Sequence, residues 1–385
     1  MKYNEWCLAA LTLAMCTQRM SIAAGNIFYG LAILFFLLHL YQRHQAGETF
    51  TVPKDCKRYF LVYGLYALLL LPSVFFSVDP GRSLSKFADY FIGRIWVLPI
   101  LLFLKIDAEA IKKALLVYIG FLAFDGLWTF GERIYTHGFR SNGLGDGWLR
   151  AASIVATVFP ATLVLWLTKK VSFPGRKYLI GCAVLMVLGA LGSGTRSSWV
   201  GMLAVLPFIL YEGFVSSPKK AAAIVAILCC FGMFMYQTPA LHERFISIAN
   251  ITTNRSNGDR VEAWKVGAEM VKARPLTGFG ILEGGRVYLA HYRTKADTQG
   301  LNHFHSNYVQ TAVDSGLPGL TGLLVFLLYN FWNFRHLGNP YELIGFCAWV
   351  GFCAVGLFDY TLGMSAAVKA LWFMTGCCMR LRETV

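Results

Sequence analysis

The amino-acid sequence predicts an all-α protein that crosses a membrane about twelve times. Of its 385 residues, 56% are hydrophobic and only 15% are charged, and the mean hydropathy is +0.52. Soluble domains contain about 25% charged residues, so this composition is typical of a polytopic membrane protein. Apolar runs near the length that spans a bilayer, about 20 residues, recur along the chain. The long polar stretch lies in residues 238–313.

Twelve apolar runs predict the helices. They cover residues 5–22, 26–41, 59–76, 88–104, 111–130, 149–168, 177–192, 197–211, 221–237, 314–334, 342–358 and 363–379. We therefore expect transmembrane helices 1–9 in residues 1–237, a catalytic loop with amphipathic helices in 238–313, and helices 10–12 in 314–385. The first run has features of a signal peptide, but Gln18 and Arg19 interrupt the cleavage region, so an uncleaved span is expected.

The distribution of Lys and Arg predicts the orientation. The richer set of inter-helix loops carries Arg43, Lys54, Lys57, Arg58, Lys105, Lys112, Lys113, Lys169, Lys170, Arg176, Lys177, Lys219 and Lys220. Positive loops stay in the cytoplasm, so both termini are expected there and the 238–313 loop on the outer side. This bias explains much of the net charge of +14, and no basic–aromatic module indicates nucleic acid. The ten cysteines show neither a disulfide framework nor zinc spacing.

A glycine-containing turn at 192–199 (Gly-Ser-Gly-Thr-Arg-Ser-Ser-Trp) is the first candidate anion site. Arg196 is predicted at the N-terminus of the following helix, where the helix dipole disfavours a cation unless an anion joins them. Ser197 or Ser198 can cap that helix. An arginine that anchors the turn at lipid headgroups is the alternative.

The second candidate follows in the polar loop. Asp259 and Glu262 have capping-box spacing, and an apolar stripe predicts an amphipathic helix that Pro275 ends. The stripe consists of Val261, Trp264, Ala268 and Val271. Arg260 is then expected at a helix N-terminus, where an anion can bind. Plain surface charge is the alternative.

The third candidate is His305, in the sequence His-Phe-His-Ser-Asn-Tyr of residues 303–308. A histidine at the water edge of a helix bundle can take a proton near pH 7. Ser306 or Asn307 is expected to cap a short helix that leads to 314–319, and a role in this turn is the alternative for His305. No cysteine or nearby glutamate completes a metal site with the two histidines.

Further candidates lie in other outer loops and turns. Residues that could bind substrate are Arg82, Lys86, Arg140, Asn307 and Asp359. Arg94 and Lys369 fall within predicted spans and need partners there. No Asp-x-Asp or Glu-x-Asp pair that would hold a divalent cation occurs in an outer loop. Arginines can replace the metal because guanidinium binds phosphate oxygens in pairs, so neither metal nor cofactor is expected.

Four motifs in this order resemble the O-antigen ligase and polymerase family of bacterial inner membranes. They are residues 193–199, 260–264, 275–280 (Pro-Leu-Thr-Gly-Phe-Gly) and 305–310 (His-Ser-Asn-Tyr-Val-Gln). The motif-bearing part covers about residues 190–320, and the hydropathy pattern is similar along the whole chain. Val309 stands where leucine is usual, a mild departure.

The resemblance implies transfer of a glycan from undecaprenyl diphosphate to the lipid A–core oligosaccharide of lipopolysaccharide. It implies a periplasmic, metal-free and inverting reaction, with the essential arginines at Arg196 and Arg260 and the essential histidine at His305. Asp359 is expected to orient His305 or Arg260. Related alternatives are an O-antigen polymerase and a protein O-oligosaccharyltransferase. A transporter or flippase is the alternative from another class, although no internal repeat is visible.

Overall fold

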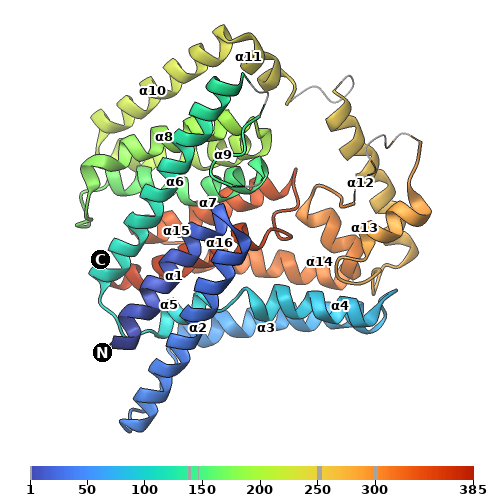
Figure 1. Cartoon of the computed structure of the whole chain (residues 1–385), viewed down its shortest axis with the longest axis horizontal. Helices are drawn as coiled ribbons and strands as arrows, with labels where there is room; N and C mark the ends of the chain where they lie inside the picture. The colour runs from blue at the N-terminus through green and yellow to red at the C-terminus, as the bar shows by residue number, and fades with distance from the viewer. Residues whose placement is uncertain are drawn as a thin grey trace.

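The computed structural model describes residues 2–137, 140–145, 147–248, 254–295, 297, 300 and 302–385. Within these ranges the chain folds into helices joined by turns and loops, without a strand, which confirms the predicted all-α class (Figure 1). The helices are α1 (Lys2–Met20), α2 (Ile22–Gln45), α3 (Lys54–Phe75), α4 (Pro80–Phe87), α5 (Val97–Phe103), α6 (Ala108–Thr136), α7 (Trp148–Leu167), α8 (Leu179–Ser193), α9 (Arg196–Ser216), α10 (Pro218–Gln237), α11 (Pro239–Ile246), α12 (Arg255–Ala273), α13 (Gly284–Val287), α14 (Asn307–Asn333), α15 (Pro340–Gly356) and α16 (Ser365–Leu381).

Each of the twelve predicted apolar ranges contains helix. Among the described residues, eight helices are long and apolar enough to cross a membrane, and α15 is apolar but shorter. The eight are α2, α3, α6, α7, α8 with its preceding turn (176–193), α9, α10 and α14. The count of twelve crossings stays a prediction.

The fourth predicted range, 88–104, differs from a single helix. Here α4 passes into a π-helical turn, η1 (Ala88–Gly93), before α5 begins. Arg94 stands at this break, where Nη2 pairs with Asp89 at 2.7 Å and Nη1 donates to the Leu362 carbonyl at 2.8 Å. The other cation in a predicted span, Lys369, donates to Asn26 Oδ1 at 3.2 Å. Both cations therefore have the partners that the sequence could not identify.

The centre of the bundle is α7. Of its most apolar 18-residue stretch, 83% is buried inside the protein. It packs against α8, α9, α15 and α16. Its polar side chains are satisfied locally: the Ser153 hydroxyl donates to the Leu149 carbonyl and the Thr157 hydroxyl donates to the Ser153 carbonyl. Such bonding lets hydroxyl groups lie in an apolar interior. Helices α8, α9, α15 and α16 therefore pack against a buried central helix.

The polar loop has a small core of its own, which we call the outer apolar cluster. Its buried members are Ala263, Met270, Phe279, Tyr288, Phe304 and Val313. These residues join α12 and the α13 region to the start of α14, and Figure 1 shows α12 and α13 beside α14 at one end of the molecule. The loop is thus a packed subdomain on the bundle.

Helix α14 begins at Asn307, earlier than the predicted residue 314. Ser306 caps it, because its Oγ accepts a hydrogen bond from the Val309 N–H. The helix is interrupted at Gly316, whose φ of 65° is left-handed. The expected short capped helix is therefore the first part of α14, before this kink.

Helix α12 begins at Arg255, with Asn254 as its cap, so the predicted capping box of Asp259 and Glu262 is wrong. The predicted apolar stripe also does not coincide with the fully buried face, because Val261, Trp264 and Val271 are only partly buried and Ala268 is exposed. The buried face consists of Asp259, Ala263, Gly267 and Met270. A Cβ added at Gly267 would lie 2.8 Å from Val309 Cγ1, so close packing against α14 requires small residues on this face. The close approach of α12 to α14 decides which face of α12 is buried, and hydropathy does not report such an approach.

Candidate functional site

One cavity of about 460 Å³ collects residues from distant parts of the chain. Its described lining residues are Arg140, Gly147, Trp148, Leu149, Thr195, Arg196, Ser197, Arg244, Ser256, Asp259, Arg260, His305 and Asp359. We call it the arginine cavity. The structure therefore brings together Arg196, Arg260 and His305, as well as Arg140 and Asp359 from loops that were predicted to face outward.

Asp359 joins the segments of this site. It lies in the turn between α15 and α16 and is almost fully buried. Its Oδ1 is 3.3 Å from Arg260 Nη2 and 3.3 Å from His305 Nδ1. Its Oδ2 accepts a hydrogen bond from the Ser197 hydroxyl. One carboxylate thus connects α9, α12 and the segment before α14.

His305 has the geometry of a general base. Its Nδ1 faces the Asp359 carboxylate, which can only accept, so the neutral ring carries its hydrogen on Nδ1. The free lone pair is then on Nε2, as in serine-hydrolase triads. The separation of 3.3 Å is long for a hydrogen bond, and catalytic bonds commonly shorten when substrate binds. His305 also has a left-handed φ of 46°, so its backbone needs support from neighbours.

Arg260 lies in the second turn of α12 and not at its N-terminus, which corrects the prediction. Because α12 begins five residues earlier, the helix dipole does not act on Arg260 as expected. The side chain is 20% exposed. Within the described residues its buried Nε has no hydrogen-bond acceptor. The guanidinium is thus fixed at one edge by Asp359 and retains donors for an anion.

Arg196 is the first residue of α9, as predicted. Gly194, in left-handed conformation, ends α8 and lets the chain turn directly into α9. The cap is Thr195 rather than Ser197 or Ser198. Arg196 Nη1 donates to the Ser247 carbonyl at 2.8 Å, and Nη2 donates to Asn257 Oδ1 at 2.8 Å. These acceptors are neutral, so they orient the guanidinium without neutralising it.

Two further arginines line the cavity, and Arg244 was missed from the sequence. Arg244 belongs to α11 and its Nε donates to the Gly194 carbonyl at 2.9 Å. Burial, followed by the charges of Arg140 and Arg196, lowers its pKa to about 10. Burial and the charge of Arg260 likewise lower the pKa of Arg140, and Asp359 acts in the opposite direction. Like charges crowded in this way favour binding of an anion.

The charges of the cavity indicate the class of ligand. Its described lining carries four guanidinium groups and two carboxylates, Asp259 and Asp359. A diphosphate diester, with one negative charge on each phosphate, would balance the excess. Arg244 could have been found by the argument used for the other arginines of predicted outer loops, because it also departs from the predicted positive-inside distribution. Asp259 and Ser197 gave no separate signal.

Three predicted substrate-binding residues lie outside the arginine cavity. Arg82 Nε pairs with buried Glu283 at 2.9 Å, and Lys86 follows on the same helix, α4. Asn307 is buried; its Nδ2 donates to Thr361 Oγ1 at 2.8 Å and its Oδ1 accepts from the Leu362 N–H at 2.9 Å. Both amide ends of Asn307 thus hold the segment that follows Asp359. Substrate binding by these three residues stays a prediction.

A further feature of the described ranges concerns side chains that could bind a metal ion. In those ranges, no group of three or more His, Cys, Asp or Glu residues gathers in a way that could hold an ion. The cations near Asp359 are the arginines themselves. Their fixed donors can stabilise phosphate oxygens without a metal.

The imidazole of His303 lies against His305, with ring centroids 4.1 Å apart. Burial, and then the neighbouring His305, lowers the pKa of His303 to about 4. Asp359 opposes this shift and Arg260 adds to it. Protonation of His303 in the folded protein is thus less favourable than in the unfolded chain, where the pKa is about 6.5.

This depressed pKa predicts sensitivity to acid. The contribution of neutral His303 to folding is complete above about pH 6.5 and is lost as the pH falls toward 4. We expect the melting temperature in detergent to fall less over this range for His303→Phe than for the unaltered protein. His291→Gln removes an exposed imidazole from the same loop and is the control. Equal acid sensitivity of all three proteins would contradict the prediction.

Comparison with known proteins gives two matches. Residues 181–324 match a protein family described as O-antigen ligase. This range contains Arg196, Arg260 and His305, whereas Asp359 lies beyond it. The chain is also 23% identical over 191 residues to an uncharacterised protein of Haemophilus influenzae. That alignment covers 45% of this chain and 46% of the relative, so the match spans about half the length of either protein.

Proposed function

We propose that this chain, which belongs to the O-antigen ligase family by the match of residues 181–324, ligates a glycan from undecaprenyl diphosphate onto lipid A–core oligosaccharide. The family match and the apolar helices support a bacterial membrane protein of the O-antigen ligase and polymerase type of glycosyltransferase. The donor, the acceptor, the inner-membrane location and the periplasmic orientation are parts of the proposal.

The observation that carries the proposal is that Asp359 contacts both the proposed base, His305, and a proposed phosphate-binding group, Arg260. The same carboxylate oxygen lies 3.3 Å from His305 Nδ1 and 3.3 Å from Arg260 Nη2. This arrangement fixes the distance between the atom that takes a proton and the atoms that would bind the leaving group. Arg196 completes the cavity from α9.

The proposed reaction is a single displacement. His305 Nε2 takes the proton of an acceptor sugar hydroxyl while its oxygen attacks the anomeric carbon of the donor. The new glycosidic bond forms as the bond from that carbon to the diphosphate oxygen breaks. The bond electrons leave with undecaprenyl diphosphate, and Arg196 and Arg260 stabilise the developing negative charge. Attack opposite the leaving group inverts the anomeric centre.

Reconstitution tests this proposal directly. The purified protein would be incubated with lipid-linked glycan and rough lipopolysaccharide, and the product followed by its gel mobility. We expect ligation to persist in a metal chelator and to be lost in His305→Ala. Full activity of His305→Ala would disprove the base, and loss in chelator that a divalent cation restores would disprove the metal-free reaction.

The same assay separates the alternatives. A polymerase lengthens the lipid-linked glycan when no lipopolysaccharide is present, and a protein O-oligosaccharyltransferase modifies only an added polypeptide acceptor. Movement of the donor across vesicle membranes without any covalent product would indicate a transporter. Each of these results would replace the acceptor or the reaction proposed here.

A further inference from the structure

The backbone just before His305 is held by hydrogen bonds from two side chains. Phe304, the preceding residue, is buried in the outer apolar cluster. The side chain of Gln310 accepts a hydrogen bond from the Phe304 N–H at 3.0 Å. The indole of Trp264 donates to the Phe304 carbonyl at 2.7 Å. Both polar groups of Phe304 are therefore satisfied by side chains, outside any regular helix.

Gln310 is itself held in one orientation. Its Nε2 donates to Asp314 Oδ2 at 3.0 Å, one turn further along α14. The Phe304 N–H can only donate, so the amide oxygen must face it and the amide nitrogen is left to donate to Asp314. Gln310 is 1% exposed, and no solvent competes for these bonds.

Asp314 is fixed by the backbone of another segment. Its Oδ2 also accepts from the Leu282 N–H at 3.1 Å, and its Oδ1 accepts from the Gly284 N–H at 3.0 Å. The backbones approach closely at Gly278, whose φ is 61°: an added Cβ would lie 2.4 Å from the Asp314 carbonyl oxygen. This accounts for a glycine in the Pro275–Gly280 motif, which contributes no residue to the arginine cavity.

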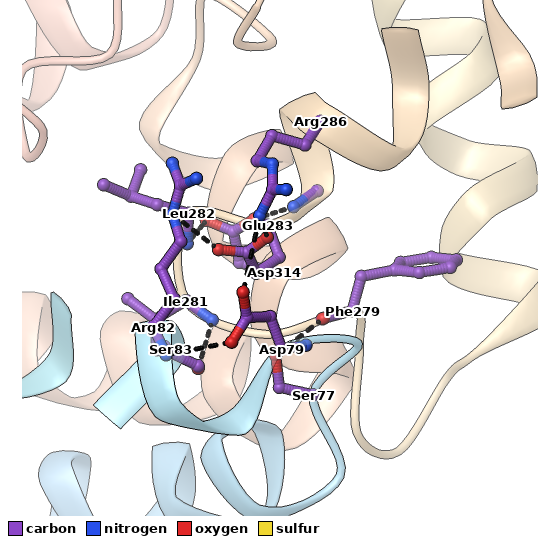
Figure 2. A network of polar contacts seen from close by, with 11 residues as sticks. Ser77, Asp79, Arg82, Ser83, Phe279, Ile281, Leu282, Glu283, Arg286 and Asp314 are labelled. Carbon is purple, nitrogen blue, oxygen red and sulfur yellow. Dashed lines mark hydrogen bonds and ion pairs between the residues drawn. The ribbon is translucent and has the colours of Figure 1, made fainter. Parts of the chain in front are cut away.

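The segment around Asp314 is in turn anchored to α4 (Figure 2). The Ile281 N–H donates to Ser83 Oγ at 2.9 Å. Buried Glu283 lies between two arginines, 2.9 Å from Arg82 Nε and 2.7 Å from Arg286 Nη1. Contacts therefore run from α4 through Asp314 and Gln310 to the peptide that precedes His305.

We propose that Gln310 is a positioning residue for the base, held by Asp314 and the Pro275–Gly284 segment so that His305 faces Asp359. This inference rests on the proposed role of His305. Gln310 does not line the arginine cavity and touches no group proposed to bind the diphosphate. Its loss should therefore disturb the proton transfer and leave donor binding intact.

Gln310→Met keeps the length of the side chain and removes both hydrogen bonds. We expect kcat for ligation to fall about 10- to 100-fold, the effect of a small misplacement of a reacting group, with little change in the donor KM. The matched control is Asn330→Leu in the same helix. Asn330 is a buried amide that accepts from the Tyr59 hydroxyl at 2.6 Å and donates to the Phe326 carbonyl at 2.8 Å, away from the site. This control should lower the melting temperature and leave kcat unchanged.

A second variant tests the same proposal if Gln310→Met does not fold. Trp264→Phe keeps an aromatic ring and removes the donor to the Phe304 carbonyl, so a lower kcat is again expected. Unchanged kcat in folded Gln310→Met, with His305→Ala inactive, would overturn the inference and leave the proposed function intact. A fall in kcat matched by a similar fall in the control would also overturn it. If His305→Ala is active, the proposed function itself fails.

Discussion

Arg260→Ala is expected to lower kcat for glycan transfer by about 10³- to 10⁵-fold, as the loss of a phosphate-stabilising arginine does in phosphoryl-transfer enzymes. The reason is geometric. Asp359 fixes Nη2 of this guanidinium at 3.3 Å, and its buried Nε has no acceptor among the described residues. Within the described residues, donors of Arg260 are thus left available for the substrate. Single-turnover rates with saturating donor measure this effect without product release.

Arg196→Ala should produce a loss of the same order. Among the described residues, neutral acceptors on Ser247 and Asn257 hold its guanidinium. Lysine should rescue neither position, because an ammonium group cannot give two parallel hydrogen bonds to a phosphate. We expect the double variant to be little worse than either single variant, since groups that act on one leaving group are not additive.

The control for this prediction is Lys265→Ala, which removes an exposed cation from the same helix as Arg260. Its rate should be unchanged. An equal loss in this control would mean that bulk charge attracts the donor to the loop. A rise in donor KM with unchanged kcat at Arg260 would mean ground-state binding alone. Either result would contradict stabilisation of the transition state.

The helices were predictable because any segment that lies within lipid must consist mostly of apolar residues. All twelve apolar ranges contain helix. The range predicted for the central helix, 149–168, agrees with the bounds of α7, Trp148–Leu167, to one residue at either end. The break at 88–96 was not predictable, because Asp89 and Arg94 lie in an otherwise apolar run and an unbroken helix could also hold such a pair. Hydropathy reports the environment of a segment, whereas the course of its backbone depends on partners such as Asp89 and Leu362.

The candidate site was predictable in part for a different reason. Arg196, Arg260 and His305 stood in recognisable motifs, and Asp359 stood out as a carboxylate in a short outer turn. The most buried face of α12 was not predicted because the small residues Ala263 and Gly267 lie on the side that packs against α14. Convergence on one carboxylate depends on how four distant segments pack, which no local pattern contains.

Asp359→Asn is the second large effect, with an expected fall in kcat of about 10³- to 10⁴-fold, comparable to the loss in a serine-hydrolase triad when its aspartate becomes asparagine. The amide keeps the size of the side chain but carries no charge and gains a donor. An amide nitrogen in place of Oδ1 would face Nδ1 of His305 and would favour the wrong tautomer, with the hydrogen on Nε2. It would also release Arg260. Base and leaving-group stabilisation are therefore lost together.

Three comparisons isolate this role of Asp359. Ser197→Ala removes only the hydrogen bond to Oδ2 and should have a much smaller effect on kcat. Glu342→Gln makes the same chemical change at a buried carboxylate near the start of α15 and should leave kcat unchanged. In a background of His305→Ala, Asp359→Asn should still lower the residual rate, because Arg260 loses its anchor. If it does not, the carboxylate acts through His305 alone, and its contact with Arg260 contributes nothing to the reaction.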